Sequence, residues 1–337
     1  MSEKSFFDSM YIYFKAKNGI IIQNLNKIFK FLLVGSVSRI DIMREKKIIH
    51  EERSVRKDNA LNLNDEYYQY FWKDGIGDKI LGSNGSLQYF TPEIFRSLLN
   101  EIMSPKFMSL YYCGKNTKDF IIDIRDICDN YKCEHHTGRL ITINDLDIFF
   151  NNSAVELLKN QRSGKRTVVL YALGKYKDRK TALILSLLAL SLSYGKSGYL
   201  VEKFRYESEN LYYITTKPYF LFKNAYLEIS IFHTDTVVTA MHEGIRDVFT
   251  SPAFYDYIDG NIEYIKRDMM DYIEAKSEEG KLMRDFLLFL AKENEINEAE
   301  GLNINHISDI IRNISPDDLI TYIRENIRNN YCALVLY

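Results

Sequence analysis

Cysteine and histidine side chains gather between positions 128 and 136 of the sequence. Cys128, Cys133, His135 and His136 offer thiolate and imidazole groups, which are the ligands that zinc prefers. Structural zinc sites usually consist of two regularly spaced pairs of ligands, but here four positions separate the two cysteines and no second pair follows. We therefore interpret this segment as part of a linker, with an unrelated structural zinc site as the alternative.

The elements that must position any functional side chain follow a repeated order. A strand pattern, an apolar helical pattern and a highly charged helical pattern occur in succession in each half of the chain. They lie at 7–16, 19–34 and 39–58 in the first half and at 226–232, 236–249 and 262–276 in the second. This order predicts an internal duplication of an α+β unit.

Two further segments support the duplication, because each opens with a polar helix cap followed by proline. Thr91-Pro92-Glu93 and Ser315-Pro316-Asp317 both predict the start of a helix that leads into an apolar strand. The second copy is preceded by a strand at 167–173 and a helix at 181–193 that have no counterpart in the first. We expect two homologous α/β-sandwich domains, each an antiparallel-rich sheet covered by helices, with the first domain truncated at its N-terminus. The predicted boundaries are 1–130, a linker at 131–161, and 162–337.

The composition excludes several classes of protein. The chain has 337 residues, and its 44 basic and 46 acidic side chains leave a net charge of -2, so no basic field exists to attract nucleic acid or anionic lipid. Its 25 tyrosines and 20 phenylalanines favour a compact protein with aromatic cores or interfaces. Four cysteines cannot build a dense disulfide framework. The start lacks a signal-peptide pattern, and the longest apolar run, 182–192, is too short to span a bilayer, so we expect a cytoplasmic protein without membrane insertion.

Five segments in the same order resemble motifs of the pitrilysin/insulinase family of inverted-zincin metallopeptidases, especially its mitochondrial-processing-peptidase-like branch. They are REKKIIHEE at 44–52, ILGS at 80–83, FTPE at 90–93, YYCG at 111–114, and the segment 202–212 with EKFR at its start and LY at its end. The resemblance covers nearly the whole chain. It implies that the two α+β domains are of the pitrilysin-like type.

Zinc binding in that family uses an H-x-x-E-H helix and a distant glutamate. The resemblance places the distant ligand at Glu52, with Glu45 as a supporting carboxylate two helical turns earlier. None of the six histidines forms H-x-x-E-H, and the chain begins at the strand that follows this helix in the family. We therefore expect Glu52 to be a vestigial ligand position on a solvated helix face, no metal or other cofactor in this chain, and zinc in a partner subunit.

Arg205 and Tyr212 keep the spacing of an arginine and a tyrosine that the family's non-catalytic half contributes to substrate binding. A guanidinium can hold a peptide carbonyl or carboxylate, and a phenol can donate to a carbonyl oxygen that gains charge during attack. We expect these two residues to bind substrate and no catalytic residue to lie in this chain alone. Glu209 stands where the family segment has glycine. The plainer alternative is an ordinary surface arginine and an ordinary strand tyrosine.

These features together resemble the non-catalytic subunits of two-component peptide-maturation proteases. The resemblance implies a catalytically incomplete subunit that forms a heterodimer with a zinc-bearing paralogue. It would position an extended peptide, such as a ribosomal peptide or bacteriocin precursor, for cleavage by that partner. The alternative is a non-enzymatic scaffold in a biosynthetic or membrane complex.

Overall fold

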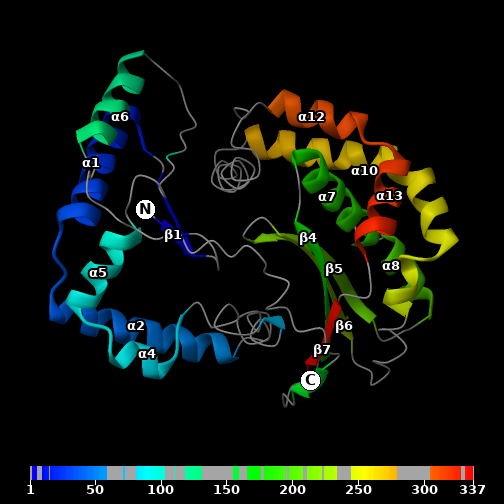
Figure 1. Cartoon of the computed structure of the whole chain (residues 1–337), viewed down its shortest axis with the longest axis horizontal. Helices are drawn as coiled ribbons and strands as arrows, with labels where there is room; N and C mark the ends of the chain where they lie inside the picture. Colours follow the sequence, from blue (N-terminus) through cyan, green and yellow to red (C-terminus); the bar gives the residue numbers. More distant parts are fainter. Residues whose placement is uncertain are drawn as a thin grey trace. The chain divides into compact units, whose positions relative to one another are not determined.

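The structure is a computed structural model. It describes residues 2–5, 10–14, 16–58, 71–72, 81–102, 110, 118–130, 155–158, 165–175, 178–193, 195, 197–207, 211–221, 224–233, 244–278, 304–327 and 331–336. The chain divides into two compact units (Figure 1). Unit 1 contains residues 1–68 and 78–142, and unit 2 contains 69–77 and 143–337. Phe71 and Trp72, which the sequence places in the first domain, are buried, and Trp72 packs against Tyr226 of unit 2.

Unit 1 combines a short hairpin with a set of helices. Strands β1 and β2 pair antiparallel. The described elements are β1 Ser2–Ser5, β2 Met10–Tyr13, α1 Asn18–Val34, α2 Arg39–Asp58, α4 Asn84–Gln88, α5 Pro92–Ile102 and α6 Lys118–Asn130. Of the strand predicted at 7–16, residues 10–13 are described as a strand, and residues 14 and 16 are not in one. The helix predicted at 39–58 has the predicted bounds. The apolar strand expected after the helix that begins near Thr91, at 107–113, lies outside the described residues except for Leu110, which is not in a strand.

Helix α1 organises the helical part of unit 1, because it contacts both α5 and α6. Its Leu25 is buried, as are Leu99 of α5 and Phe120 of α6. Arg96 of α5 also donates from Nη1 to the carbonyl of Leu32 at 3.1 Å. These contacts hold the helices of unit 1 together.

Unit 2 contains a five-stranded sheet in the order β3-β7-β4-β6-β5. Only β3 and β7 run parallel, and the other neighbours are antiparallel. The strands are β3 Val155–Leu158, β4 Lys165–Lys175, β5 Leu211–Leu221, β6 Asn224–His233 and β7 Tyr331–Leu336. Strand β3 lies within the predicted linker 131–161, so the end of that segment joins the sheet.

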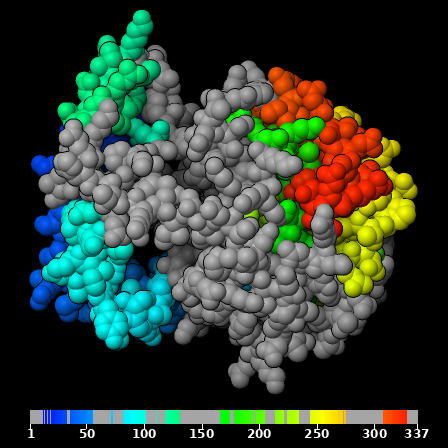
Figure 2. Space-filling view, in the orientation of Figure 1, coloured from blue at the N-terminus to red at the C-terminus, as the bar shows by residue number. Residues whose placement is uncertain are grey.

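Helices cover one face of this sheet (Figure 1). They are α7 Arg179–Ser193, α8 Tyr199–Glu207, α10 Pro252–Glu278, α12 Ile304–Asn313 and α13 Pro316–Asn326. Alternate residues of β4 and β6, such as Val169 and Ile229, lie in one hydrophobic core with Leu188 of α7 and Ile311 of α12. Figure 2 shows α10, α12 and α13 forming one continuous outer surface of unit 2.

The arrangement confirms the predicted α+β class, with a mainly antiparallel sheet covered by helices. Ser315 caps α13 in a capping box with Asp318, as the serine-proline pair predicts. None of the helices in the described part of the chain combines the length and apolar character needed to cross a bilayer.

Candidate functional site

The predicted substrate-binding residues lie on two consecutive elements of unit 2. Arg205 lies in the last turn of α8, and Tyr212 is the second residue of β5. Helix α8 contacts β5 and is anchored by Leu200 and Phe204, which are buried in the core on the helix side of the sheet. The side chains of Arg205 and Tyr212 lie outside the described part of the structure, as does Glu209. Arg205 therefore lies just before the segment that connects α8 to β5, and Tyr212 lies just after it.

Tyr212 lies at an irregularity of the sheet. Leu211 pairs with His233 and Tyr213 pairs with Phe232, so the register between β5 and β6 shifts across Tyr212. Two steps along β5 match one step along β6, which is the definition of a β-bulge. A bulge breaks the regular alternation of side chains and re-aims one of them, and bulges are frequent beside active sites. Tyr212 is therefore set apart from the regular ladder.

A row of three side chains crosses the sheet next to this bulge, on the face opposite the helices. Arg166 of β4 pairs with Phe232 of β6, which pairs with Tyr213 of β5. The rings of Tyr213 and Phe232 stack with centroids 4.1 Å apart and planes 17° apart. The Arg166 guanidinium lies 5.0 Å from the centroid of the Phe232 ring.

Arg166 is held by a buried polar cluster on β6. Its Nη2 donates to Glu228 Oε1 at 3.2 Å and to Ser230 Oγ at 2.9 Å, and the serine hydroxyl donates to the same carboxylate at 2.8 Å. Glu228 and Ser230 alternate with apolar residues of β6. That alternation of polar and apolar residues along one strand is the sequence signal that could have identified this cluster.

The predicted metal position lies in unit 1, on α2. Glu45 and Glu52 are both exposed on this helix. In the described ranges, no three histidine, cysteine, aspartate or glutamate side chains come close enough to hold a metal ion. A zinc site needs at least three protein ligands, so the described donors around Glu52 do not fit a catalytic zinc.

The cysteine and histidine cluster at 128–136 falls mainly outside the described residues. Cys128 is half-buried near the end of α6. Cys133, His135 and His136 are not among the described residues. The linker and zinc interpretations of this segment both remain predictions.

Two of the sequence motifs are joined directly by Arg53 of α2. Its Nη1 donates to Asn84 Oδ1 at 2.9 Å, and its Nη2 donates to the carbonyl of Leu81. Gly82 has a φ of 68°, a conformation that favours glycine, and Ser83 caps α4. The segments REKKIIHEE and ILGS are therefore neighbours in space.

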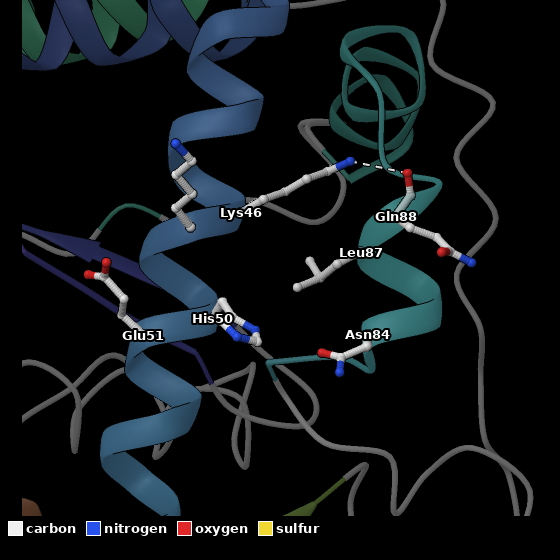
Figure 3. Close-up of a pocket in the computed structure, with 7 residues that line it drawn as sticks. Lys46, His50, Glu51, Asn84, Leu87 and Gln88 are labelled. Atoms are coloured by element: carbon white, nitrogen blue, oxygen red, sulfur yellow. Dashed lines mark hydrogen bonds between the residues drawn. The ribbon is translucent and has the colours of Figure 1, made fainter.

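A pocket of about 370 Å³ lies between α2 and α4, and sequence reasoning did not identify it. Its lining residues are Lys46, Lys47, His50, Glu51, Asn84, Leu87 and Gln88. The side chain of Lys46 extends from α2 toward α4, and its Nζ donates to the Gln88 carbonyl at 3.2 Å (Figure 3). The side chain of Glu51 points away from α4. His50 points toward Asn84, so the pocket presents an imidazole and the Asn84 amide beside the Lys46 ammonium, whereas the side chain of Gln88 points away from α2. These groups can hydrogen-bond a small polar molecule, and Glu52 does not line the pocket.

Comparison by sequence finds no matching protein-family model and no matching curated protein. Comparison by structure finds a protease from Helicobacter pylori with a TM-score of 0.73 and 12% identity, covering 94% of this chain and 76% of that chain. A peptidase M16 inactive domain from Pseudomonas fluorescens has a TM-score of 0.68 and 11% identity, covering 93% of this chain and 74% of that one. The periplasmic protease PqqL from Escherichia coli has a TM-score of 0.65 and 10% identity, covering 94% of this chain and 35% of that one.

These likenesses extend over both units, and they agree with the mixed helices and mainly antiparallel sheet of unit 2. The sequence identities are 12% or less, so these likenesses establish the fold alone. The chain therefore has the pitrilysin-like fold of the M16-like peptidases.

Proposed function

We propose that this chain is a catalytically incomplete, pitrilysin-like subunit that binds an extended peptide and positions it for a zinc-bearing paralogue. The peptide is of the ribosomal or bacteriocin precursor class, and the working unit is a heterodimer. The match to a structure described as an M16 inactive domain supports this proposal. So does the sequence, since none of its six histidines forms H-x-x-E-H.

The observation that carries the proposal is the connection between α8 and β5. Arg205 and Tyr212 lie on two elements that pack together, and Tyr212 lies at a bulge. A guanidinium and a phenol offer a cation and a hydrogen-bond donor to the oxygens of a peptide. Such donors contribute most where negative charge develops on the scissile carbonyl.

The proposed division of labour follows from the donors that each subunit holds. The partner supplies the zinc together with the water and the general base. This chain supplies the peptide contacts, with Arg205 holding a carbonyl or carboxylate and Tyr212 donating to the reacting carbonyl oxygen. The described donors around Glu52 take no part in this scheme.

A second candidate function is a non-enzymatic scaffold, and one observation favours it. Among the described residues, every exposed large hydrophobic side chain except Tyr213 and Tyr264 belongs to unit 1. Examples are Phe31 of α1 and Ile40 and Met43 of α2, which are 51%, 69% and 62% exposed. Exposed apolar side chains mark a surface that binds other proteins where they form a contiguous patch.

Peptide cleavage by the reconstituted heterodimer separates the two candidates. Arg205→Ala and Tyr212→Phe should each reduce turnover about 100-fold or more, because each removes a positioned donor. Glu52→Gln on the same polypeptide is the matched control and should leave turnover nearly unchanged. Partner binding by sizing chromatography should be equal for all three variants. Full activity of both Arg205→Ala and Tyr212→Phe would contradict the substrate-binding role and favour the scaffold.

A further inference from the structure

The ring of Tyr213 forms an open aromatic surface on the sheet face opposite the helices. One side of the ring stacks on Phe232, yet Tyr213 is 42% exposed. In the described part of unit 2, the only other exposed large hydrophobic side chain is Tyr264, which lies on α10. A tyrosine that is already stacked on one side offers its other face to a second flat group at little entropic cost.

The side chains next to Tyr213 on the sheet restrict the position of its ring. Phe232 lies between Tyr213 and Arg166 in the cross-strand row, and Arg166 is held by its bonds to Glu228 and Ser230. Side chains directly opposite one another in a sheet restrict each other's rotamers, so the buried polar cluster orients Phe232 and Phe232 orients Tyr213. The aromatic surface is therefore preorganised.

The charge beside this ring is positive. Among the described side chains on this face of β4 to β7, Arg166, Glu228 and Lys217 are charged, which leaves one net positive charge. Arg166 and Glu228 are paired with each other. Lys217 lies directly opposite Glu228 in the register of β5 and β6, and its side chain is exposed. A basic ligand side chain would be repelled here, and a carboxylate would be attracted.

Tyr213 and Lys217 lie on the same face of β5, four residues apart, with half-exposed Thr215 between them. A strand rises about 3.3 Å per residue, so the two positions are separated by roughly 13 Å along β5. An extended peptide alongside β5 presents residues four positions apart on one face at the same separation. Strand β5 is also an edge of the sheet, so its outer side is not taken by another described strand.

We propose that Tyr213 and Lys217 form a specificity site that selects extended peptides carrying an aromatic residue and a carboxylate four positions apart. The aromatic ring of the peptide stacks on Tyr213, and the carboxylate pairs with Lys217. This inference rests on the proposed peptide-binding function, and it assigns the substrate class that such a site would accept. Both residues lie on the strand that carries Tyr212, so the selected peptide passes beside that position.

Fluorescence anisotropy with the purified full chain tests this site. The probes are fluorescein-labelled peptides of serine and threonine that carry one phenylalanine and one aspartate four positions apart, in either order. Replacing phenylalanine by alanine in the probe should weaken binding about tenfold. Replacing aspartate by asparagine should weaken it about two- to fivefold, with the difference lost at high salt. A spacing of three positions should abolish the joint gain, because it puts the two side chains on opposite faces.

Variants of the chain then assign each preference to one residue. Tyr213→Ala should remove the tenfold preference for phenylalanine, and Tyr213→Phe should retain it. Lys217→Ala should remove only the preference for aspartate. Tyr264→Ala, which removes another exposed tyrosine of unit 2, is the matched control and should change neither.

Three results would overturn the inference. One is equal binding of the phenylalanine probe and a probe in which leucine replaces phenylalanine, which would reduce the site to an ordinary apolar contact. Another is an unchanged preference in Tyr213→Ala. The third is no binding of any probe. In each case the cleavage experiment on Arg205 and Tyr212 decides the proposed function independently, because it measures turnover by the heterodimer rather than binding by this chain.

Discussion

Arg166→Met should destabilise unit 2 by about 3–5 kcal/mol, because it removes the guanidinium that pairs with the buried carboxylate of Glu228. The side chain of Glu228 is 1% exposed and that of Arg166 is 9% exposed, so water cannot replace the guanidinium. Methionine keeps much of the length and apolar character of the arginine stem. The loss should therefore report the missing charge and hydrogen bonds more than a cavity.

The size of the stability loss in Arg166→Met depends on the contacts that Glu228 keeps in the variant. Ser230 still donates to Glu228, but the contact at 3.2 Å from the guanidinium is gone. Removing both charges, in Arg166→Met/Glu228→Leu, eliminates the buried carboxylate together with the guanidinium. Replacing a whole buried ion pair by apolar residues is often neutral or stabilising. The double variant should therefore recover most of the loss and lie within about 2 kcal/mol of the parent protein.

Urea unfolding followed by tryptophan fluorescence measures these differences for unit 2 alone. The sequence contains one tryptophan. This residue, Trp72, is buried in unit 2 and packs edge-on against Tyr226 of β6, with ring centroids 5.3 Å apart. Its emission therefore reports the unfolding of the strand that carries Glu228. A loss below about 1 kcal/mol in Arg166→Met, or a double variant no more stable than the single one, would refute this reasoning.

Further changes test other parts of the molecule. Burial raises the pKa of Asp318, but hydrogen bonds from Lys180 and Ser315 outweigh burial and lower it overall. The resulting stabilisation is present above the pKa of the unfolded carboxyl, about 4, and is lost as pH falls through the lowered folded value, so Asp318→Asn should flatten the acid limb of thermal unfolding. Gly82→Ala should destabilise unit 1 by about 1–2 kcal/mol in circular-dichroism melts, because φ is 68° there. Metal analysis of the purified chain should find no stoichiometric zinc, and one zinc per chain lost on Glu52→Gln would contradict the vestigial assignment.

Local patterns in the sequence predicted the elements that depend on local physics. The charged stretch 39–58 forms a helix over the predicted residues, and the strand predicted at 226–232 extends by only a few positions. The serine-proline pair at Ser315 marks the start of α13, because the cap and the fixed φ of proline act within one helical turn. Each of these features is complete within a short segment, so its pattern alone identifies it.

The candidate sites depend on pairing between distant segments, which local patterns do not specify. Arg166 and Glu228 are 62 positions apart and meet only because β4 and β6 pair in one register. The bulge at Tyr212 exists only relative to β6, and β3 joins the sheet only through β7, near the end of the chain. A shift of one residue in a strand moves every side chain to the other face, so the register decides whether these groups meet.

Strand β6 connects the buried polar cluster to the proposed peptide site. Its Glu228 and Ser230 hold Arg166, and its Phe232 supports Tyr213 beside the bulge that carries Tyr212. A buried ion pair adds little net stability compared with apolar residues of the same size, so stability alone does not account for the cluster. Orientation does account for it, because a held guanidinium against one side of the row fixes the aromatic ring on the other. The same polar cluster that makes Arg166→Met costly therefore also supports the edge strand at which we propose that peptides are selected.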